Sequence, residues 1–362
     1  MKWDFAIGNP PYQNSLESYN RQEPVYPHFY DAATEIAESY LLITPARFLF
    51  NAGLTPKEWN KKMLSDEHLK VEYYNQNAAE VFPNTDIKGG VAVVYRNANE
   101  SFGAIDEFVQ DETLRRIVEK FKSIKDSGEN LSSQVYGGRS DLKFNHRFIE
   151  EYPRSKEDRL TAIKKKHPNA KQLAQNEEYE LKSSTFDILP YVFLTQEPKH
   201  SEDYYKILGL FGGKRTYRWI SREFMTPRYP DNNNIDAYKT FIPSASGNGQ
   251  FGEALSALVV GEQGTSATPT FLSIGRFKTI NEAENVAKYI KTKFVRALFS
   301  VKKVTQHITP NSWVYVPLQD FTDNSDINWN TSIANIDKQL YKKYGLSQEE
   351  IDFIETHVKE MA

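Results

Sequence analysis

The first twelve residues, MKWDFAIGNPPY, constrain the fold more than any other stretch of the chain. Trp3 to Gly8 is a short, nearly continuous apolar run, typical of a buried strand. Gly8 and two prolines stop this run, because proline cannot donate a hydrogen bond to a sheet. The chain must therefore leave its first strand through a rigid loop, Asn9-Pro10-Pro11-Tyr12.

The next eighty residues alternate between helical and strand patterns. Apolar residues recur with helical spacing in 26–39 and 56–64, whereas buried-strand patterns occupy 40–45, 70–75 and 90–96. Strands that alternate with helices are typical of an α/β fold, in which a mostly parallel sheet carries helices on its faces. We therefore predict an α/β domain over residues 1–105.

The rest of the chain lacks this regular alternation of helix and strand patterns. A charged amphipathic stretch from Asp106 to Ser127 predicts a connector helix, assigned to 106–130. Residues 131–340 contain short apolar runs broken by Gly, Pro and Asn clusters, typical of an irregular α+β domain with long loops. One helix is expected from Glu284 to Val301, and another in 341–362, where Ser347 and Glu350 form a capping box.

Composition excludes several classes of protein. The 362 residues include no cysteine, so disulfides, thiolate metal sites and cysteine nucleophiles are absent. The sequence lacks both a signal-peptide pattern and any run of eighteen apolar residues, so we expect a cytoplasmic protein without a membrane partner. The net charge of −3 argues against indiscriminate coating of nucleic acid.

The loop Asn9-Pro10-Pro11-Tyr12 carries a recognisable chemistry. In open α/β sheets, ligands bind beyond the carboxyl ends of the strands, where Asn9 stands. Two prolines fix successive φ angles and so hold the Asn9 amide oxygen and the Pro10 carbonyl in one geometry. Two such acceptors suit a planar amino group, and Tyr12 offers a face for stacking its ring. The alternative without a catalytic role is a proline-rich turn with an asparagine cap.

This loop resembles the catalytic motif of gamma-class DNA methyltransferases that methylate the adenine amino group in restriction–modification systems. YLLITPARFLFNAG from Tyr40 is similar to the strand and loop that follow that motif. EVFPNTDIKGGVAVVYRN from Glu80 is similar to a late motif whose aromatic, here Phe82, packs on the target base. GTSATPTFLSIGRF, KYIKTKFVRALFSVKKVTQ and WVYVPLQDF are similar to the recognition portion of bifunctional enzymes of this family.

The resemblance implies a function and roles for individual residues. Asn9 and Pro10 would accept the two amino hydrogens of an adenine that has left the duplex stack. Tyr12 and Phe82 would stack on the two faces of that base, and the methyl donor would be S-adenosylmethionine. The catalytic set is therefore Asn9, Pro10, Pro11 and Tyr12. Neither a metal nor a general base is required, because catalysis is positioning plus hydrogen bonding.

The family places a glycine-rich cofactor loop ahead of the catalytic motif, and here nothing stands ahead of it. By that order the chain supplies strands four to seven of a seven-stranded Rossmann-like sheet, so we expect a fragment that is inactive alone. The missing portion, or a partner subunit, would complete it. GNGQFG, residues 247–252, matches G-x-G-x-x-G, but its context favours a loop of the recognition domain over a permuted cofactor loop.

Two groups of basic residues with interleaved aromatics are candidates for contacts with double-stranded DNA. The proposed contacts are Lys214, Arg215, Arg218 and Arg222 in one group, and Lys288, Lys291, Lys302 and Lys303 in the other. Either group could instead be an ordinary solvated surface. The residues do not reveal a recognition sequence, and no paired-carboxylate and lysine core indicates a nuclease.

Two alternatives to the methyltransferase remain open at this stage. One is a DNA-recognition module whose catalytic half is degenerate. The other is a methyltransferase that acts on protein glutamine side chains and shares the tetrapeptide, although such chains are shorter and lack a long basic C-terminal domain.

Overall fold

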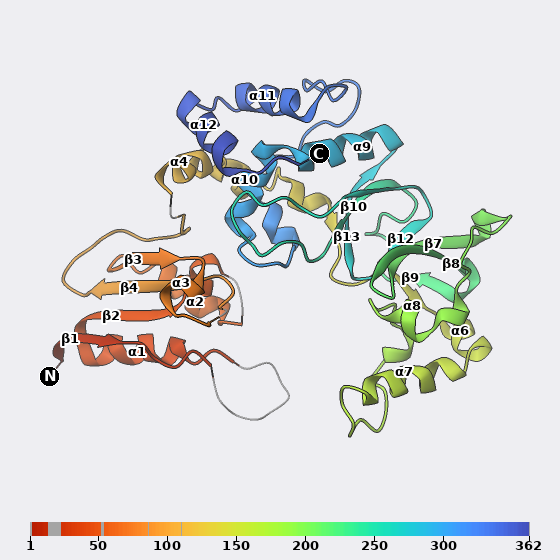
Figure 1. Cartoon of the computed structure of the whole chain (residues 1–362), viewed down its shortest axis with the longest axis horizontal. Coiled ribbons are helices and arrows are strands. Elements are labelled where there is room, and N and C mark those ends of the chain that lie inside the picture. The colour runs from red at the N-terminus through yellow and green to blue at the C-terminus, as the bar shows by residue number, and fades with distance from the viewer. Residues whose placement is uncertain (1, 14–22, 52–53, 86, 110, 362) are drawn as a thin grey trace. The chain divides into compact units, whose positions relative to one another are not determined.

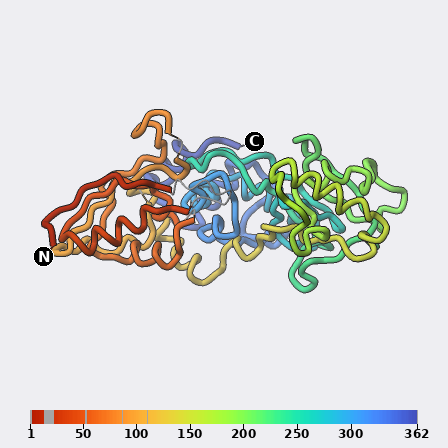
Figure 2. Tube along the Cα trace, turned by 90° about the horizontal axis from the view of Figure 1, so that it is seen from below, coloured from red at the N-terminus to blue at the C-terminus, as the bar shows by residue number. Residues whose placement is uncertain are grey.

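The computed structural model describes residues 2–13, 23–51, 54–85, 87–109 and 111–361. Contacts divide the chain into two compact units. The first comprises Met1–Glu119, Asn248–Phe251 and Ser300–Thr305, and the second comprises Lys120–Gly247, Gly252–Phe299 and Gln306–Ala362. Most of the first unit is therefore N-terminal, red to orange in Figures 1 and 2.

The first unit contains one four-stranded sheet in the order β1-β2-β4-β3 (Figure 1). Its strands are β1 (Trp3–Gly8), β2 (Ala37–Pro45), β3 (Leu69–Asn75) and β4 (Val91–Asn97). β1 and β2 are parallel, whereas β4 is antiparallel to both β2 and β3. β1, β2 and β3 therefore run in one direction, with β4 inserted against them.

The predicted parallel sheet is thus only partly realised, and the connections explain why. β1 and β2 are joined through helix α1 (Tyr26–Ile36), which is long enough to return the chain for parallel pairing. β3 and β4 are joined through α3 (Ala78–Val81), a single turn, and the chain reverses direction. α1 also ends earlier than the sequence pattern indicated, because residues 37–39 belong to β2.

Two helices cover one face of this sheet. Along β2, Tyr40 and Leu42 are buried and share a core with Tyr30 of α1 and Trp59 of α2 (Lys57–Leu64). The rings of Tyr30 and Trp59 lie 5.6 Å apart between centroids. Because side chains alternate across a strand, the intervening Leu41 must point to the opposite face, where it is only half-buried.

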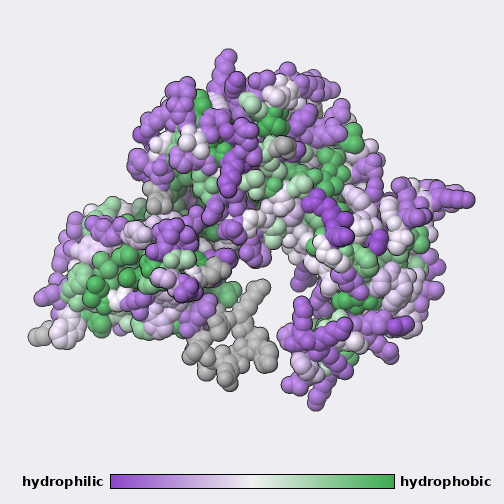
Figure 3. Space-filling view, viewed as in Figure 1, coloured by the Kyte–Doolittle hydropathy of each residue, from purple (hydrophilic) through white to green (hydrophobic). Residues whose placement is uncertain are grey.

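The opposite face of the sheet is open at its edge strand. Trp3, Phe5 and Ile7 of β1 share that face and are 74%, 49% and 75% exposed. Figure 3 shows apolar surface over the sheet of this unit. Phe5 stacks on Tyr95 of β4, with centroids 6.4 Å apart. The core residues of α1 and α2 pack with Tyr40 and Leu42, which point to the other face of the sheet. An edge strand with three exposed large apolar side chains is unusual unless a partner covers it.

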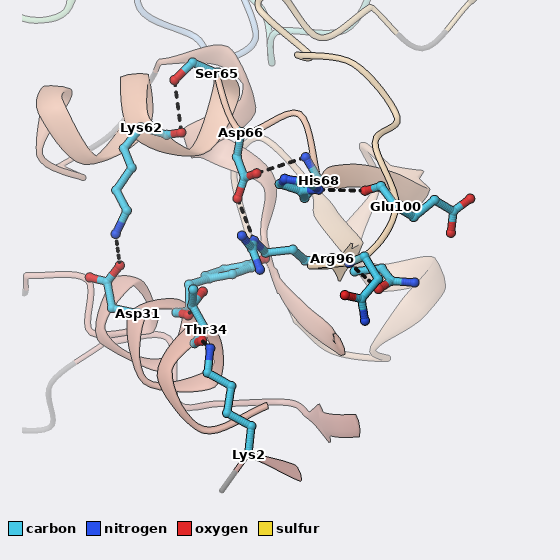
Figure 4. A network of polar contacts seen from close by, with 12 residues as sticks. Lys2, Asp31, Thr34, Lys62, Ser65, Asp66, His68, Arg96 and Glu100 are labelled. Carbon is cyan, nitrogen blue, oxygen red and sulfur yellow. Dashed lines mark hydrogen bonds and ion pairs between the residues drawn. The ribbon is translucent and has the colours of Figure 1, made fainter. Parts of the chain in front are cut away.

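A polar network ties α2, β3 and β4 together near Asp66 (Figure 4). Asp66 accepts a hydrogen bond from Arg96 Nε at 2.6 Å and another from the His68 amide at 2.9 Å. His68 Nδ1 lies 2.8 Å from the Glu100 carbonyl oxygen. The side chains of Arg96 and Asp66 are both mostly buried, so their ion pair is shielded from solvent.

Replacing Asp66 by alanine is expected to lower the free energy of unfolding by about 2 kcal/mol, because the Arg96 guanidinium and the His68 amide both lose an acceptor. The matched control is Lys62→Ala, which breaks the exposed Lys62–Asp31 pair and should change stability by less than about 0.5 kcal/mol. Denaturant unfolding followed by tryptophan fluorescence measures both variants. Equal losses would show that the Asp66 network adds no more than a surface ion pair.

The second unit combines small sheets with helices. Its sheets have the orders β11-β10-β13-β5, β12-β7-β8 and β6-β9. Their strands are β5 (Val135–Tyr136), β6 (Leu142–Phe144), β7 (Tyr204–Phe211), β8 (Lys214–Ser221), β9 (Met225–Pro227), β10 (Tyr238–Pro243), β11 (Val259–Gly261), β12 (Thr265–Ala267) and β13 (Phe271–Phe277). This mixture of small sheets and helices agrees with the irregular α+β domain that the sequence pattern predicts.

The helices of the second unit are mostly short. They are α5 (Lys122–Ser127), α6 (His146–Glu151), α7 (Arg154–Lys164), α8 (Thr185–Ile188), α9 (Ile280–Lys291), α10 (Lys293–Lys302), α11 (Ile333–Lys343) and α12 (Gln348–His357). α4 (Glu112–Lys120) leads into this unit from the first. The capping box of Ser347 and Glu350 is confirmed at α12. Within the described ranges, none of the helices combines the length and hydropathy of a bilayer-spanning segment.

Both long helices expected from the sequence are interrupted. The connector begins at Glu112 rather than Asp106 and breaks at Phe121, between α4 and α5. The Phe121 ring is fully buried against Phe294 and Tyr344. The helix expected from Glu284 to Val301 breaks at Thr292, whose backbone is extended.

Candidate functional site

The carboxyl ends of three strands meet at one edge of the first unit's sheet. Pro45 of β2 and Asn75 of β3 both lie opposite Val91, the first residue of β4. Gly8 of β1 pairs with Leu42, so the residues after it continue along β2 toward Pro45. The loops after β1, β2 and β3 therefore converge at this edge, the usual ligand-binding side of an α/β sheet.

The Asn9-Pro10-Pro11-Tyr12 loop begins this edge. Pro10 is buried, whereas Asn9 is exposed and its amide is accessible. Tyr12 Oη donates a hydrogen bond to Asn9 Oδ1 at 2.8 Å. Burial raises the pKa of Tyr12, so its hydroxyl is protonated at neutral pH and acts as a donor. The loop thus holds the Asn9 amide oxygen in a fixed orientation, with a second lone pair still available.

Tyr12 and Gln13 are held beside the residues that precede α1. The Val25 amide donates to the Tyr12 carbonyl at 3.2 Å, and Gln13 forms a bridge with Pro24. Tyr30, at the floor of this region, shares a hydrogen bond with Thr44 at 2.9 Å, and burial holds its pKa well above the ordinary value. The described hydroxyl groups near Asn9 are therefore neutral, and they offer hydrogen bonding rather than a base.

Phe82 lies at the same edge, directly after α3. Its amide donates to the Ala78 carbonyl at 2.8 Å, and its side chain is half-buried. β1 and β3 are the outer strands of the sheet, about 14 Å apart at three strand spacings. Among the described residues, no ring contact or hydrogen bond joins Phe82 to Tyr12, so the structure does not bring the two predicted stacking residues together.

Sequence reasoning missed the residues that fix this loop. Arg47, directly after β2, donates through Nε to the Lys88 carbonyl, and the Ala46 amide donates to the Gly90 carbonyl at 3.0 Å. Gly90 has a φ of +80°, and a Cβ there would lie 2.3 Å from the carbonyl oxygen of Asn75. The adjacent pair Gly89-Gly90 was the available signal, because glycine is required where backbones approach this closely.

At the end of β3, two asparagine side chains hold one carboxylate. Asn75 and Asn77 each donate to Glu80 at 2.9 Å, and these hydrogen bonds lower the pKa of Glu80. Gln76 donates to the carbonyl of Gly249. The turn that precedes Phe82 is therefore built from neutral amides around an ionised carboxylate.

Part of the GNGQFG loop belongs to this unit, which corrects the sequence interpretation. Asn248–Phe251 groups by contacts with the first unit rather than with the expected recognition domain. A Cβ at Gly249 would lie 2.3 Å from the carbonyl carbon of Val304, so its glycine serves close backbone packing. β10 precedes the loop, but no helix follows it before β11, and this order does not fit a cofactor loop.

Comparisons with known proteins gave a match to one protein family over the N-terminal part of the chain. Residues 1–82 match the protein family described as Eco57I restriction-modification methylase. This segment contains the Asn9–Tyr12 loop and ends at Phe82, so the region of the site is similar to the methylase of a restriction–modification system. A search of curated proteins gave no significant match.

One solved structure aligns with most of the chain. The type IIL restriction-modification enzyme MmeI in complex with DNA aligns with 98% of this chain and 56% of that one. The sequence identity is 9% and the TM-score is 0.45. The chain thus spans little more than half the length of that enzyme.

The first predicted group of DNA contacts lies on the β7–β8 hairpin and the turn after it. Lys214 and Arg215 are exposed. Arg215, Arg218 and Arg222 each stack on an aromatic ring, those of Phe271, Phe211 and Tyr205 respectively. Arg222 also lies 3.9 Å from Asp236. The most accessible charges of this group are therefore those of Lys214 and Arg215.

The second predicted group is less accessible. Lys288 donates to the Trp329 carbonyl at 2.8 Å, and Lys291 is half-buried. Lys302 forms an ion pair with Glu107, and Lys303 is only 2% exposed. We drop Lys302 and Lys303 from the proposed DNA contacts, because one is neutralised and the other is enclosed by protein.

Proposed function

We propose that this chain is part of a restriction–modification methyltransferase that transfers a methyl group from S-adenosylmethionine to the amino group of adenine in DNA. The observation that carries this proposal is the Asn9–Tyr12 loop, held at the carboxyl edge of the sheet within the segment that matches the methylase family. Its exposed amide oxygen and neighbouring tyrosine suit a flat ring that bears an amino group.

In the proposed mechanism the chain's own residues bind and orient the target base. Asn9 Oδ1 and the Pro10 carbonyl accept the two amino hydrogens, which draws the nitrogen lone pair out of conjugation and makes it a better nucleophile. Tyr12 stacks on one face of the ring, and Phe82 approaches the other from the α3–β4 loop. Stabilisation by fixed acceptors costs no reorganisation during the reaction.

S-adenosylmethionine supplies the methyl group in this proposal, but the described residues do not form a site that fits it. The one glycine-rich sequence with suitable spacing packs on the backbone of Val304. We therefore assign the cofactor site to polypeptide outside this chain, either another portion of the same protein or a partner subunit.

The open face of the sheet supports this assignment. Trp3, Phe5 and Ile7 form an exposed apolar row on the outermost strand, where a further strand and its helix would bury them. Such a completion would turn a sheet covered on one side into a sheet covered on both sides, as α/β folds require. The cofactor-bearing polypeptide is the proposed occupant of this face.

Double-stranded DNA is the proposed partner of the second unit. Lys214 and Arg215 expose cationic groups on the β7–β8 hairpin, and Lys and Arg contacts to phosphates orient a protein on duplex DNA. Arg218, Arg222, Lys288 and Lys291 stay in the proposal as less accessible candidates.

The test is reconstitution. The isolated chain should show no binding of S-adenosylmethionine by calorimetry and no transfer of labelled methyl to duplex DNA. Co-expression with the coding sequence immediately upstream should restore labelling of adenine. Tight cofactor binding by the isolated chain would overturn the assignment of the cofactor site. Labelling of cytosine or protein by the reconstituted enzyme would overturn the substrate.

A further inference from the structure

A cleft of about 920 Å³ lies within the second unit, outside both predicted DNA-contact groups. It is built on the two-stranded β6–β9 ribbon, in which Lys143 pairs with Thr226. Cross-strand partners point to the same side, and both of these side chains line the cleft. The neighbouring Leu142 and Met225 are buried in the core, which fixes the ribbon's register and therefore the direction of Lys143.

The carboxylates of the cleft are already neutralised. Glu180 receives two hydrogen bonds from Arg228, at 3.1 and 2.7 Å, and Arg228 also donates to the Ser140 carbonyl at 3.0 Å. Glu177 forms an ion pair with Lys182. The charges of Glu180 and Glu177 are therefore balanced by those of Arg228 and Lys182.

Two further cations of the cleft have no such partner. No acidic group among the described residues lies within 4.0 Å of Arg139 or Lys143. Arg139 is exposed and follows Gly138, whose φ of +87° turns the chain at the cleft. The cleft thus carries two uncompensated positive charges in addition to two internal ion pairs.

We propose that this cleft binds the phosphodiester backbone of duplex DNA, with Arg139 and Lys143 as phosphate contacts. The positive charge favours an anion, and the volume is far larger than a single phosphate ion requires. The choice of DNA among polyanions rests on the proposed function, and the cleft extends the DNA surface beyond the hairpin that carries Lys214.

The test is a salt titration of DNA binding by the full chain without cofactor. The double variant Arg139→Ala/Lys143→Ala should bind a fluorescent duplex at least 10-fold more weakly at low salt. The slope of log affinity against log salt should become less negative by about 2, because each of the two phosphate contacts releases about 0.9 counterion when DNA binds. The control Lys278→Ala/Lys338→Ala makes the same charge change at exposed positions and should leave the slope unchanged.

A charge-conserving variant, Arg139→Lys/Lys143→Arg, should keep the wild-type slope if phosphate binding is the role. Equal slopes for the wild type and the alanine double variant would overturn the proposal, as would wild-type protein that does not bind duplex DNA. Calorimetry with inorganic phosphate provides a further arm. Tight phosphate binding that disappears in the alanine double variant, with DNA affinity unchanged, would identify a free-anion site instead.

These results are independent of methyl transfer. DNA binding through the cleft would stand even if the reconstituted enzyme failed to methylate adenine. Loss of the cleft proposal would likewise leave the role of Asn9 intact.

Discussion

Replacing Asn9 by alanine is expected to lower the rate of adenine methylation by the reconstituted enzyme about 100- to 1000-fold, the usual cost of removing one fixed hydrogen-bonding group that stabilises a transition state. Alanine removes the amide oxygen that accepts an amino hydrogen, so the lone pair of the target nitrogen stays conjugated with the ring. The measurement is single-turnover transfer of labelled methyl to a duplex that contains the target adenine.

Two controls separate chemistry from binding and folding. Asn9 is exposed, so the variant should keep the wild-type unfolding midpoint, and its affinity for duplex DNA should change less than threefold. Tyr12→Phe keeps the stacking ring but removes the hydroxyl that donates to Asn9 at 2.8 Å, and should cost less than about tenfold in rate. An unchanged rate for Asn9→Ala would favour the alternative of a DNA-recognition module without catalysis.

Replacing Gly90 by alanine is expected to lower the free energy of unfolding of the first unit by about 3 kcal/mol or more. The residue has a φ of +80°, and its Cβ would lie 2.3 Å from Asn75 O and 2.7 Å from Gln76 Cα. Backbone atoms of a paired strand cannot move aside as a flexible side chain can. The α3–β4 loop would therefore be displaced, and Phe82 with it.

Gly103 provides a matched control in the same unit. Its φ is +81°, but a Cβ there would meet nothing within 4 Å. Gly103→Ala should therefore cost about 1 kcal/mol, the conformational penalty alone. Denaturant unfolding of both variants isolates the contribution of close packing at Gly90. Similar losses in the two variants would show that the loop shifts without cost.

Asn9→Ala and Gly90→Ala change the same edge of the sheet. The first removes a hydrogen-bond acceptor, and the second alters the backbone of the α3–β4 loop. If Gly90→Ala also lowers methylation without changing DNA affinity, Phe82 and its loop contribute to placing the base. This outcome would link the stability of the α3–β4 loop to the proposed stacking role.

The sequence predicted the positions of the strands in the first unit well, because each is a short apolar run with clear ends. The predicted burial of β1 was wrong: Trp3, Phe5 and Ile7 are 74%, 49% and 75% exposed, because β1 is an edge strand of the sheet. Trp3–Gly8 was predicted with its exact bounds, since Pro10 and Pro11 cannot continue a ladder. The position of β4 between β2 and β3 could not be read in this way. The apolar pattern indicates where a strand runs, but it carries no information about which strand lies beside it.

The helix boundaries show a different limit. Periodicity runs unbroken from Glu284 to Val301, yet α9 ends at Lys291 and α10 begins at Lys293. The Asp337 carboxylate of α11 accepts hydrogen bonds from the Lys293 and Phe294 amides and so caps a new helix at this point. A cap supplied by a residue 43 positions or more along the chain leaves no local signal.

The sequence by itself determined the proposed chemistry of this protein, because Asn9-Pro10-Pro11-Tyr12 is a contiguous motif whose rigidity comes from covalent ring geometry. Only the tertiary structure decided which charges are accessible. It buried Lys303 and paired Lys302 with Glu107, while it left Arg139 and Lys143 uncompensated in a cleft. Burial and ion pairing depend on contacts between residues that are far apart in the sequence, and the distribution of charge along the chain does not show which of these contacts form.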